Sequence, residues 1–133
     1  MIIEKDLHKL FQQLTHDQVS QIDVNGANVV IRLVESGSKL AFSTPVYYGG
    51  NFIPSSVRQC LKQRNPFINS IGTFLTVDEK EYQIFLNYEG PFNLHIDKRL
   101  FLGLLEEFQW LADEWRAFLD EHDKNDLIYV RAK

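Results

Sequence analysis

Few residues in this sequence have types and spacings that could carry out chemistry. Cys60 and His95 are the nominal nucleophile and base, but their spacing carries no local signature of a catalytic pair. Cys60 falls on the inner face of a short predicted helix, so we interpret it as a core cysteine rather than a reactive thiol. No His-x-x-x-His or Glu-x-x-His spacing suggests a metal site. We therefore expect no catalytic site, no metal and no cofactor, and predict that the chain is not an enzyme.

The strongest pattern in the chain is a long amphipathic helix predicted over residues 97–122. Its carboxylates lie outside the apolar stripe, which favours a solvated face over a metal or acid–base site. Trp110 breaks the pattern because it projects away from the stripe, between Gly103 and Ala117. Two interpretations stay open, namely a packing tryptophan on an imperfect helix or a flat site where another chain contacts the indole. The predicted stripe comprises Leu100, Phe101, Leu104, Leu105, Phe108, Leu111, Ala112, Trp115, Phe118 and Leu119.

Length, charge and cysteine content limit the classes of protein that fit. A chain of 133 residues can bury a core without disulfides or metals, and a formal charge of -4 argues against binding nucleic acid. The single cysteine excludes an intramolecular disulfide framework and fits a reducing compartment. The sequence shows neither the apolar run of a signal peptide nor a stretch able to span a membrane. We expect a cytoplasmic protein with no direct contact to nucleic acid or membrane.

Hydrophobic periodicity predicts an α+β domain with an antiparallel sheet of about five strands and three helices, in the order α-β-β-β-α-β-β-α. We predict one domain over residues 1–122. Residues 123–133 form a polar and then apolar tail, either disordered or paired as an edge strand. The predicted helices cover residues 2–15, 54–66 and 97–122. The predicted strands cover residues 22–24, 27–35, 39–46, 71–77 and 82–88, with an aromatic and glycine-rich loop at 47–52.

Three stretches give the sequence a family resemblance. Residues 61–67 resemble the end of the second helix in class I type III secretion chaperones, where a leucine and an asparagine precede an apolar residue. Residues 72–86 resemble the paired strands that follow in that family. Residues 108–119 are similar to its final helix, in which an aromatic residue, an alanine and a tryptophan recur before a closing leucine. Element order, length and acidic balance agree, so the resemblance covers nearly the whole chain.

The resemblance implies a small bacterial virulence chaperone that works without ATP. Such a protein binds the N-terminal segment of a secreted effector or gate protein in extended form, as a homodimer or as a heterodimer with a second chaperone. Some members of the family also bind transcription components. A regulatory protein of the same fold, binding RNA polymerase or a regulator, therefore stays open as the alternative, and a small enzyme is less expected.

Two groups of apolar residues are the candidate contact sites. For the partner segment we predict contacts with Phe11, Val30, Phe42, Tyr47 and Tyr48. Phe74 and Phe85 lie on strand positions beyond those that one helix layer should cover, so we predict a dimer. In the resembling family the second helix and the later strands form the subunit contact. The predicted dimer or partner interface comprises Leu61, Phe74, Phe85 and Trp110.

Overall fold

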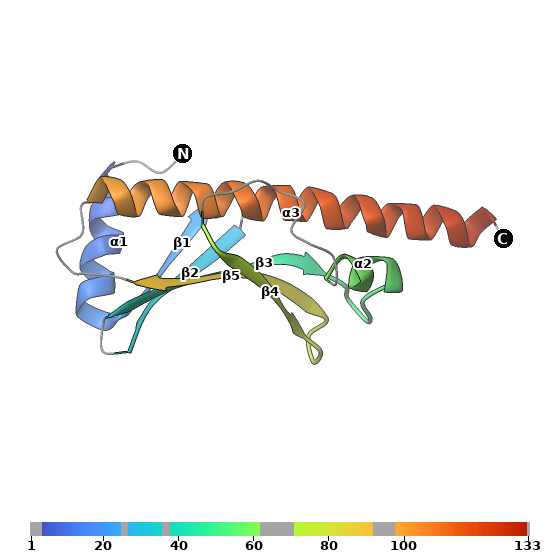
Figure 1. Ribbon diagram of the computed structural model, residues 1–133, viewed down its shortest axis with the longest axis horizontal. Coiled ribbons are helices and arrows are strands. Elements are labelled where there is room, and N and C mark those ends of the chain that lie inside the picture. Colours follow the sequence, from blue (N-terminus) through green and yellow to red (C-terminus); the bar gives the residue numbers. More distant parts are fainter. Residues whose placement is uncertain (1–3, 25–26, 36–37, 62–70, 92–97, 133) are drawn as a thin grey trace.

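The computed structural model describes residues 4–24, 27–35, 38–61, 71–91 and 98–132. Its framework is an antiparallel sheet with one long helix lying along one face (Figure 1). The helices are α1 (Glu4–Asp17), α2 (Ser55–Cys60) and α3 (Lys98–Ala132). The strands are β1 (Val19–Val24), β2 (Ala27–Val34), β3 (Lys39–Tyr48), β4 (Thr73–Asp78) and β5 (Gln83–Pro91). The predicted α+β class and element order are confirmed.

The sheet has the order β1-β2-β3-β5-β4, and every neighbouring pair is antiparallel. Consecutive strands pair as hairpins except where α2 and its flanking residues intervene between β3 and β4. The order therefore leaves β1 and β4 at the two edges. Because side chains alternate across a strand, this register gives the sheet one face under α3 and one face that none of the described helices covers.

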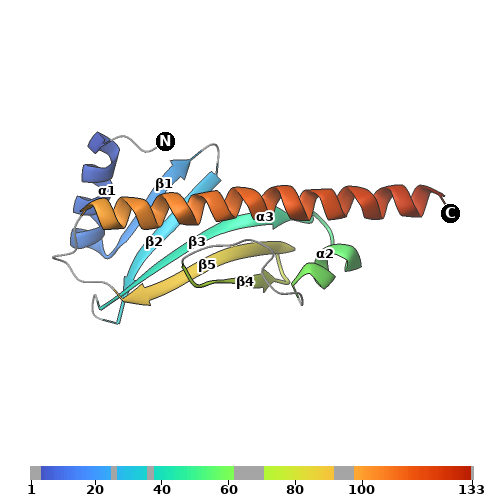
Figure 2. The same cartoon turned by 45° about the horizontal axis from the view of Figure 1, so that its top comes forward.

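The core forms where the apolar stripe of α3 meets β3. Phe42 packs against Phe101 and Phe108 of α3, with ring centroids 6.1 and 5.3 Å apart. Both contacts are edge-to-face, the arrangement that the ring quadrupoles favour. Figure 2 shows α3 running across this face of the sheet, with α1 at the end where α3 begins. Trp115 in the same stripe is 3% exposed, as its position predicted.

Arg116, beside the apolar stripe of α3, links that helix to an irregular point in β3. Its guanidinium donates to the Pro45 carbonyl oxygen from Nε (3.1 Å) and Nη2 (2.9 Å), and Nη2 also donates to Thr44 Oγ1 (2.9 Å). Thr44 is fully buried and in turn donates to the Asn28 carbonyl oxygen at 3.0 Å. The register between β3 and β5 shifts at Pro45, so Arg116 binds the bulge itself.

Side-chain bonds also fix the turn between β4 and β5. Asp78 Oδ1 accepts hydrogen bonds from the backbone nitrogens of Lys80 (3.0 Å) and Glu81 (3.2 Å). Arg58 of α2 forms a two-pronged ion pair with Glu79, at 2.9 and 3.0 Å. These hydrogen bonds lower the pKa of the Glu79 carboxyl from its ordinary value. The turn is thereby tied to α2.

The short helix α2 packs on α3. Ser56 Oγ donates to the His122 carbonyl oxygen at 3.4 Å, and the last turns of α3 extend past α2 (Figure 1). Cys60 is 2% exposed and its Sγ donates to the Ser56 carbonyl oxygen. Its prediction as a core residue is confirmed. Burial raises the pKa of the Cys60 thiol, which keeps the side chain neutral.

Several predicted boundaries are wrong. β1 begins at Val19, which pairs with Arg32, rather than at residue 22, and α2 ends at Cys60 rather than at residue 66. β3 continues through Tyr48, because Tyr47 and Tyr48 pair with β5 beyond the bulge, so the predicted loop begins only at Gly49. α3 continues to Ala132, which contradicts a disordered or strand-forming tail after residue 122. β5 reaches Pro91 because it pairs with Lys39 of β3. The domain boundary at residue 122 stays a prediction.

Candidate protein-binding site

The face of the sheet away from α3 carries a group of apolar side chains. We call this surface the open face. The strand register places its residues on the side of the sheet opposite to Phe42: Val19, Val30, Ala41, Pro45, Phe74 and Phe85. Phe74 is 50% exposed, and Val30 and Phe85 are half-buried. Phe74 and Phe85 are diagonal neighbours across β4 and β5, a spacing that large side chains can bridge. The open face thus presents apolar surface from both halves of the sheet.

Polar contacts surround this apolar surface. Between the Phe74 and Phe85 positions, Asn87 Nδ2 donates to Thr76 Oγ1 at 2.9 Å. Near the other end of β3, Lys39 Nζ lies 3.3 Å from Glu35 and 3.7 Å from Glu89. The hydrogen bond with Glu35, followed by the charges of Glu35 and Glu89, raises the pKa of Lys39, so the ammonium stays charged at neutral pH. The charge of Lys39 is thus paired within the chain, whereas Arg32, between Val19 and Ala41, is exposed on the same face.

A pocket of about 300 Å³ opens beside the edge strand β4, between that strand, α2 and α3. Thr73 Oγ1 is buried there, and no described residue gives it a hydrogen-bond partner. The pocket brings Leu61 and Phe74 together, two of the residues predicted for a subunit interface. An edge strand next to a pocket of mixed polar and apolar lining is a surface that another chain can extend or fill. The pocket is lined by Cys60, Leu61, Thr73, Phe74, Leu75, Leu86 and Trp115.

The predicted partner contacts do not form one surface. Phe42 is 1% exposed beneath α3, so its prediction as a partner contact is wrong; the alternation of β3 turns it into the core. Tyr47 is half-buried against the core, whereas Tyr48 is 65% exposed at the end of the sheet. Val30 lies on the open face, and the side chain of Phe11 lies outside the described residues.

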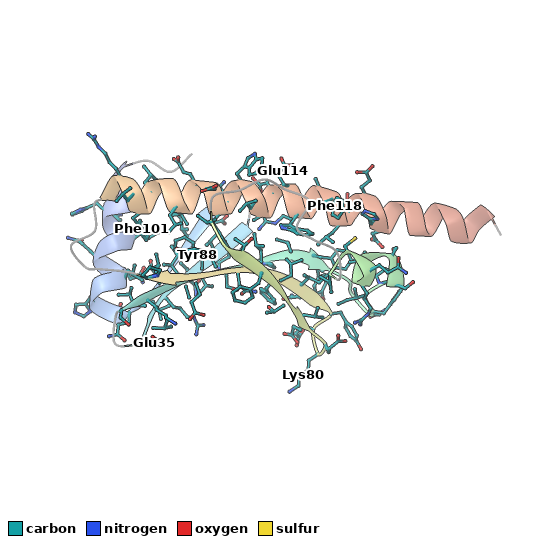
Figure 3. The ribbon with its side chains drawn as sticks, viewed as in Figure 1. Glu35, Lys80, Tyr88, Phe101, Glu114 and Phe118 are labelled. Carbon is teal, nitrogen blue, oxygen red and sulfur yellow. The ribbon has the colours of Figure 1, made fainter. Side chains whose placement is uncertain are left out.

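Trp110 lies apart from the other residues predicted for the interface. Its indole is 48% exposed on the side of α3 away from the sheet, where Figure 3 also shows Glu114 pointing outward. Phe74 and Phe85 occupy the opposite side of the molecule, on the open face. One flat contact therefore cannot bury Trp110 together with Phe74.

Three exposed apolar side chains were missed or misplaced. Phe52 is 62% exposed directly after a tight turn, in which Gly49 lies so close to the Phe52 carbonyl group that a side chain there would clash. Its position after two glycines was the only local signal. Val19 is 38% exposed at the start of the edge strand β1. Leu100 is 65% exposed, so its place in the predicted apolar stripe is wrong, because it lies about 100° round the helix from the buried Phe101.

The described side chains give little support for catalysis. Among them, no group of His, Cys, Asp or Glu residues is arranged to hold a metal ion. His95, the nominal partner of Cys60, lies outside the described residues. No helix within the part of the chain that the structure describes is long and apolar enough to cross a membrane.

Comparison with known proteins gives similarity in structure but not in sequence. The sequence matches no family profile and no curated protein. Among solved structures, the chain is similar to one chain of the ExsC–ExsE complex, with a TM-score of 0.62 and 12% identity, over 86% of this chain and 93% of that chain. It is similar to one chain of the HopA1–SchA chaperone–effector complex, with a TM-score of 0.58 and 14% identity, over 87% of this chain and 99% of that one.

A third similar structure is the heterodimeric ExoU–SpcU complex from the type III secretion system of Pseudomonas aeruginosa. One of its chains has a TM-score of 0.55 and 18% identity, over 81% of this chain and 84% of that chain. At these identities the likeness establishes the fold alone. The fold predicted from the family resemblance, that of the type III secretion chaperones, is confirmed over most of the chain.

Proposed function

We propose that this protein is a cytoplasmic type III secretion chaperone. It binds a segment of a secreted effector or gate protein in extended form and needs no ATP. The observation that carries this proposal is the fold, which is shared over more than four-fifths of the chain with chains of complexes described as chaperone–effector or type III secretion assemblies. The open face and the edge strand β1 provide surfaces suited to such binding.

The physical basis is the way an unfolded segment can satisfy its polar backbone. An extended segment can pair with the edge of β1, so that its backbone groups form hydrogen bonds in place of those with water. Its apolar side chains can then lie on the open face, where Val19 and Val30 are accessible. Burying them offsets the conformational entropy that the segment loses.

The decisive experiment is capture from the native cell. The tagged chain is purified, the co-purifying protein is identified by mass spectrometry, and limited proteolysis maps the protected region. We expect a secreted protein with a protected, otherwise unfolded N-terminal segment. Capture of RNA polymerase or a regulator, without any secreted protein, would instead support the regulatory alternative. Absence of any stoichiometric partner would contradict both.

We also propose that two copies associate through the pocket side of β4. Phe74 is half exposed there beside Leu61, and the neighbouring strand edge is unpaired within the described sheet. Sedimentation at micromolar concentration should give about twice the chain mass of 15.6 kDa. Phe74→Glu should shift this species to the monomer, because a charge cannot be buried there unpaired. Phe52→Glu, at a comparably exposed phenylalanine elsewhere, is the matched control and should leave it unchanged.

A wild-type monomer at that concentration would contradict a homodimer and would favour pairing with a second chaperone. Loss of the dimer in both variants would show that the Phe74 change acts through added charge alone.

A further inference from the structure

The outer face of α3 carries an exposed tryptophan among charged side chains. Its centre is Trp110, which is 48% exposed, whereas Trp115 five residues later is 3% exposed. Gly103 and Ala117 lie seven residues before and after Trp110 and are also exposed. Two helical turns take about 7 residues, so the three positions form one line along the helix. Small side chains on both sides leave the indole accessible from above.

Two rows of carboxylates flank this line. Seven-residue spacing places successive carboxylates of a row about 10 Å apart along the helix. Arg116 pairs with Asp113 at 2.8 Å but directs the rest of its guanidinium toward β3. Figure 3 shows Glu114 on the side of α3 that faces away from the sheet. One row begins with the exposed Arg99 and continues with Glu106, Asp113 and Asp120, and the other comprises Glu107, Glu114 and Glu121. Asp113, Glu107 and Asp120 already have partners within the chain, so a second protein would pair mainly with Glu106, Glu114 and Glu121.

The sign of this charge restricts what can cover Trp110. Nucleic acid and anionic lipid surfaces would be repelled. A second copy presenting the same face would bring like charges together, which disfavours self-association here. A solvated helix face needs its carboxylates, yet it gains nothing from a large indole held in water. A cationic partner accounts for both the exposed indole and the carboxylates, because a guanidinium can stack on the indole while neighbouring cations pair with the carboxylates.

We propose that this face of α3 binds a basic helical segment of another protein, with Arg or Lys side chains along the carboxylate rows and a guanidinium over Trp110. A helical partner is favoured because two helices share the same rise, so cations spaced by seven residues stay in register with both rows. Gly103 and Ala117 allow close approach of the partner's backbone. The surface lies opposite the open face, so this site does not depend on the proposed chaperone function.

The chain supplies its own reporter, since it contains two tryptophans and only Trp110 is exposed. The probe is an amidated helical peptide of about 21 residues, three heptads long, with Arg at heptad spacing and Ala elsewhere. The same peptide with citrulline in place of Arg keeps the shape and removes the charge. In the Trp115→Phe protein, we expect the Arg peptide to shift Trp110 emission to shorter wavelength and to saturate. The citrulline peptide should cause no shift.

Fluorescence anisotropy of the labelled Arg peptide then measures affinity without relying on the tryptophan signal. We expect Trp110→Ala to weaken binding at least about tenfold, as removal of a central aromatic anchor does. Glu106→Lys should weaken it similarly. Two matched controls should stay within about twofold of wild type: Tyr48→Ala removes another exposed aromatic ring, and Glu81→Lys reverses another exposed charge.

Several results would overturn the proposal. The first is no measurable binding by the Arg peptide, and the second is unchanged affinity in Trp110→Ala. A third is equal weakening in Glu81→Lys and Glu106→Lys, which would show that net charge alone attracts the peptide. If Trp115→Phe does not fold, the anisotropy series on the remaining variants decides the question by itself.

Discussion

Replacing Arg116 by methionine tests whether the link between α3 and the bulge in β3 stabilises the fold. Methionine retains an apolar stem of similar reach, so the change removes the guanidinium and little packing. Three hydrogen bonds are lost: two to the Pro45 carbonyl oxygen, at 2.9 and 3.1 Å, and one to Thr44 Oγ1, at 2.9 Å. The ion pair with Asp113 is lost as well.

The size of the effect follows from the acceptors left behind. A hydrogen bond from a charged donor is worth about 1.5–3 kcal/mol, but two of the three bonds share the Pro45 oxygen and cannot be counted twice. The Arg116 side chain is 27% exposed, so water can replace part of what is lost. Asp113 is 47% exposed, and its ion pair contributes about 1 kcal/mol at most. We expect Arg116→Met to lower the free energy of unfolding by about 2–4 kcal/mol.

Urea unfolding at fixed protein concentration measures this loss, because the stability of an associating protein depends on its concentration. Asp113→Asn is the control for the ion pair and should cost less than about 1 kcal/mol. Arg116→Lys should fall between the two, since an ammonium lacks the planar fork that reaches both acceptors. If Arg116→Met costs no more than Asp113→Asn, the bonds to the bulge do not stabilise the fold and the reasoning is wrong.

Two further predictions concern buried side chains. Trp115→Ala should destabilise the domain by roughly 3–5 kcal/mol in the same assay, whereas Trp110→Ala should cost less than about 1 kcal/mol; equal losses would place Trp110 in the core. Cys60→Ala should cost about 1–2 kcal/mol and leave partner capture intact, so a folded variant without binding would reopen a thiol mechanism. Because burial raises the pKa of the thiol, Cys60 should react with iodoacetamide slowly in the native protein and rapidly in urea.

Sequence periodicity predicted the elements because their signals are local. The alternation of β4 and β5 and the stripe of α3 depend on near neighbours in the chain, so element order and class follow from the sequence. The ends of the elements depend on distant pairing. Tyr48 belongs to β3 because it pairs with Gln83, beyond a bulge. The neighbouring residues do not predict that bulge. Proline at position 45 is compatible with a bulge but does not require one.

The same distinction separates the site residues that were predicted from those that were missed. Phe74 and Trp110 depart from the local pattern of their elements, and both are exposed. Phe42 was misplaced although the alternation of β3 puts it on the same face as Leu40, opposite the smaller Ala41 and Ser43, so the sequence itself indicates a core position. The structural role of Arg116 could not be predicted from its sequence neighbours, because its acceptors, Thr44 and Pro45, lie about 70 residues earlier in the chain.

The charges of α3 also explain how one small chain can present two unlike surfaces. Six of its carboxylates lie on the outer face of the helix, while the apolar stripe on the inner face faces the sheet. On the open face, Lys39 lies between Glu35 and Glu89, and the exposed Arg32 and Asp23 give the face one further charge of each sign, so no single sign dominates there. Attraction to the open face should therefore depend on apolar area and resist salt, whereas attraction to the Trp110 face should fall as salt screens the carboxylates. Because α3 and the sheet separate the two surfaces, a segment bound to one leaves the other accessible, and salt distinguishes which of them a given partner uses.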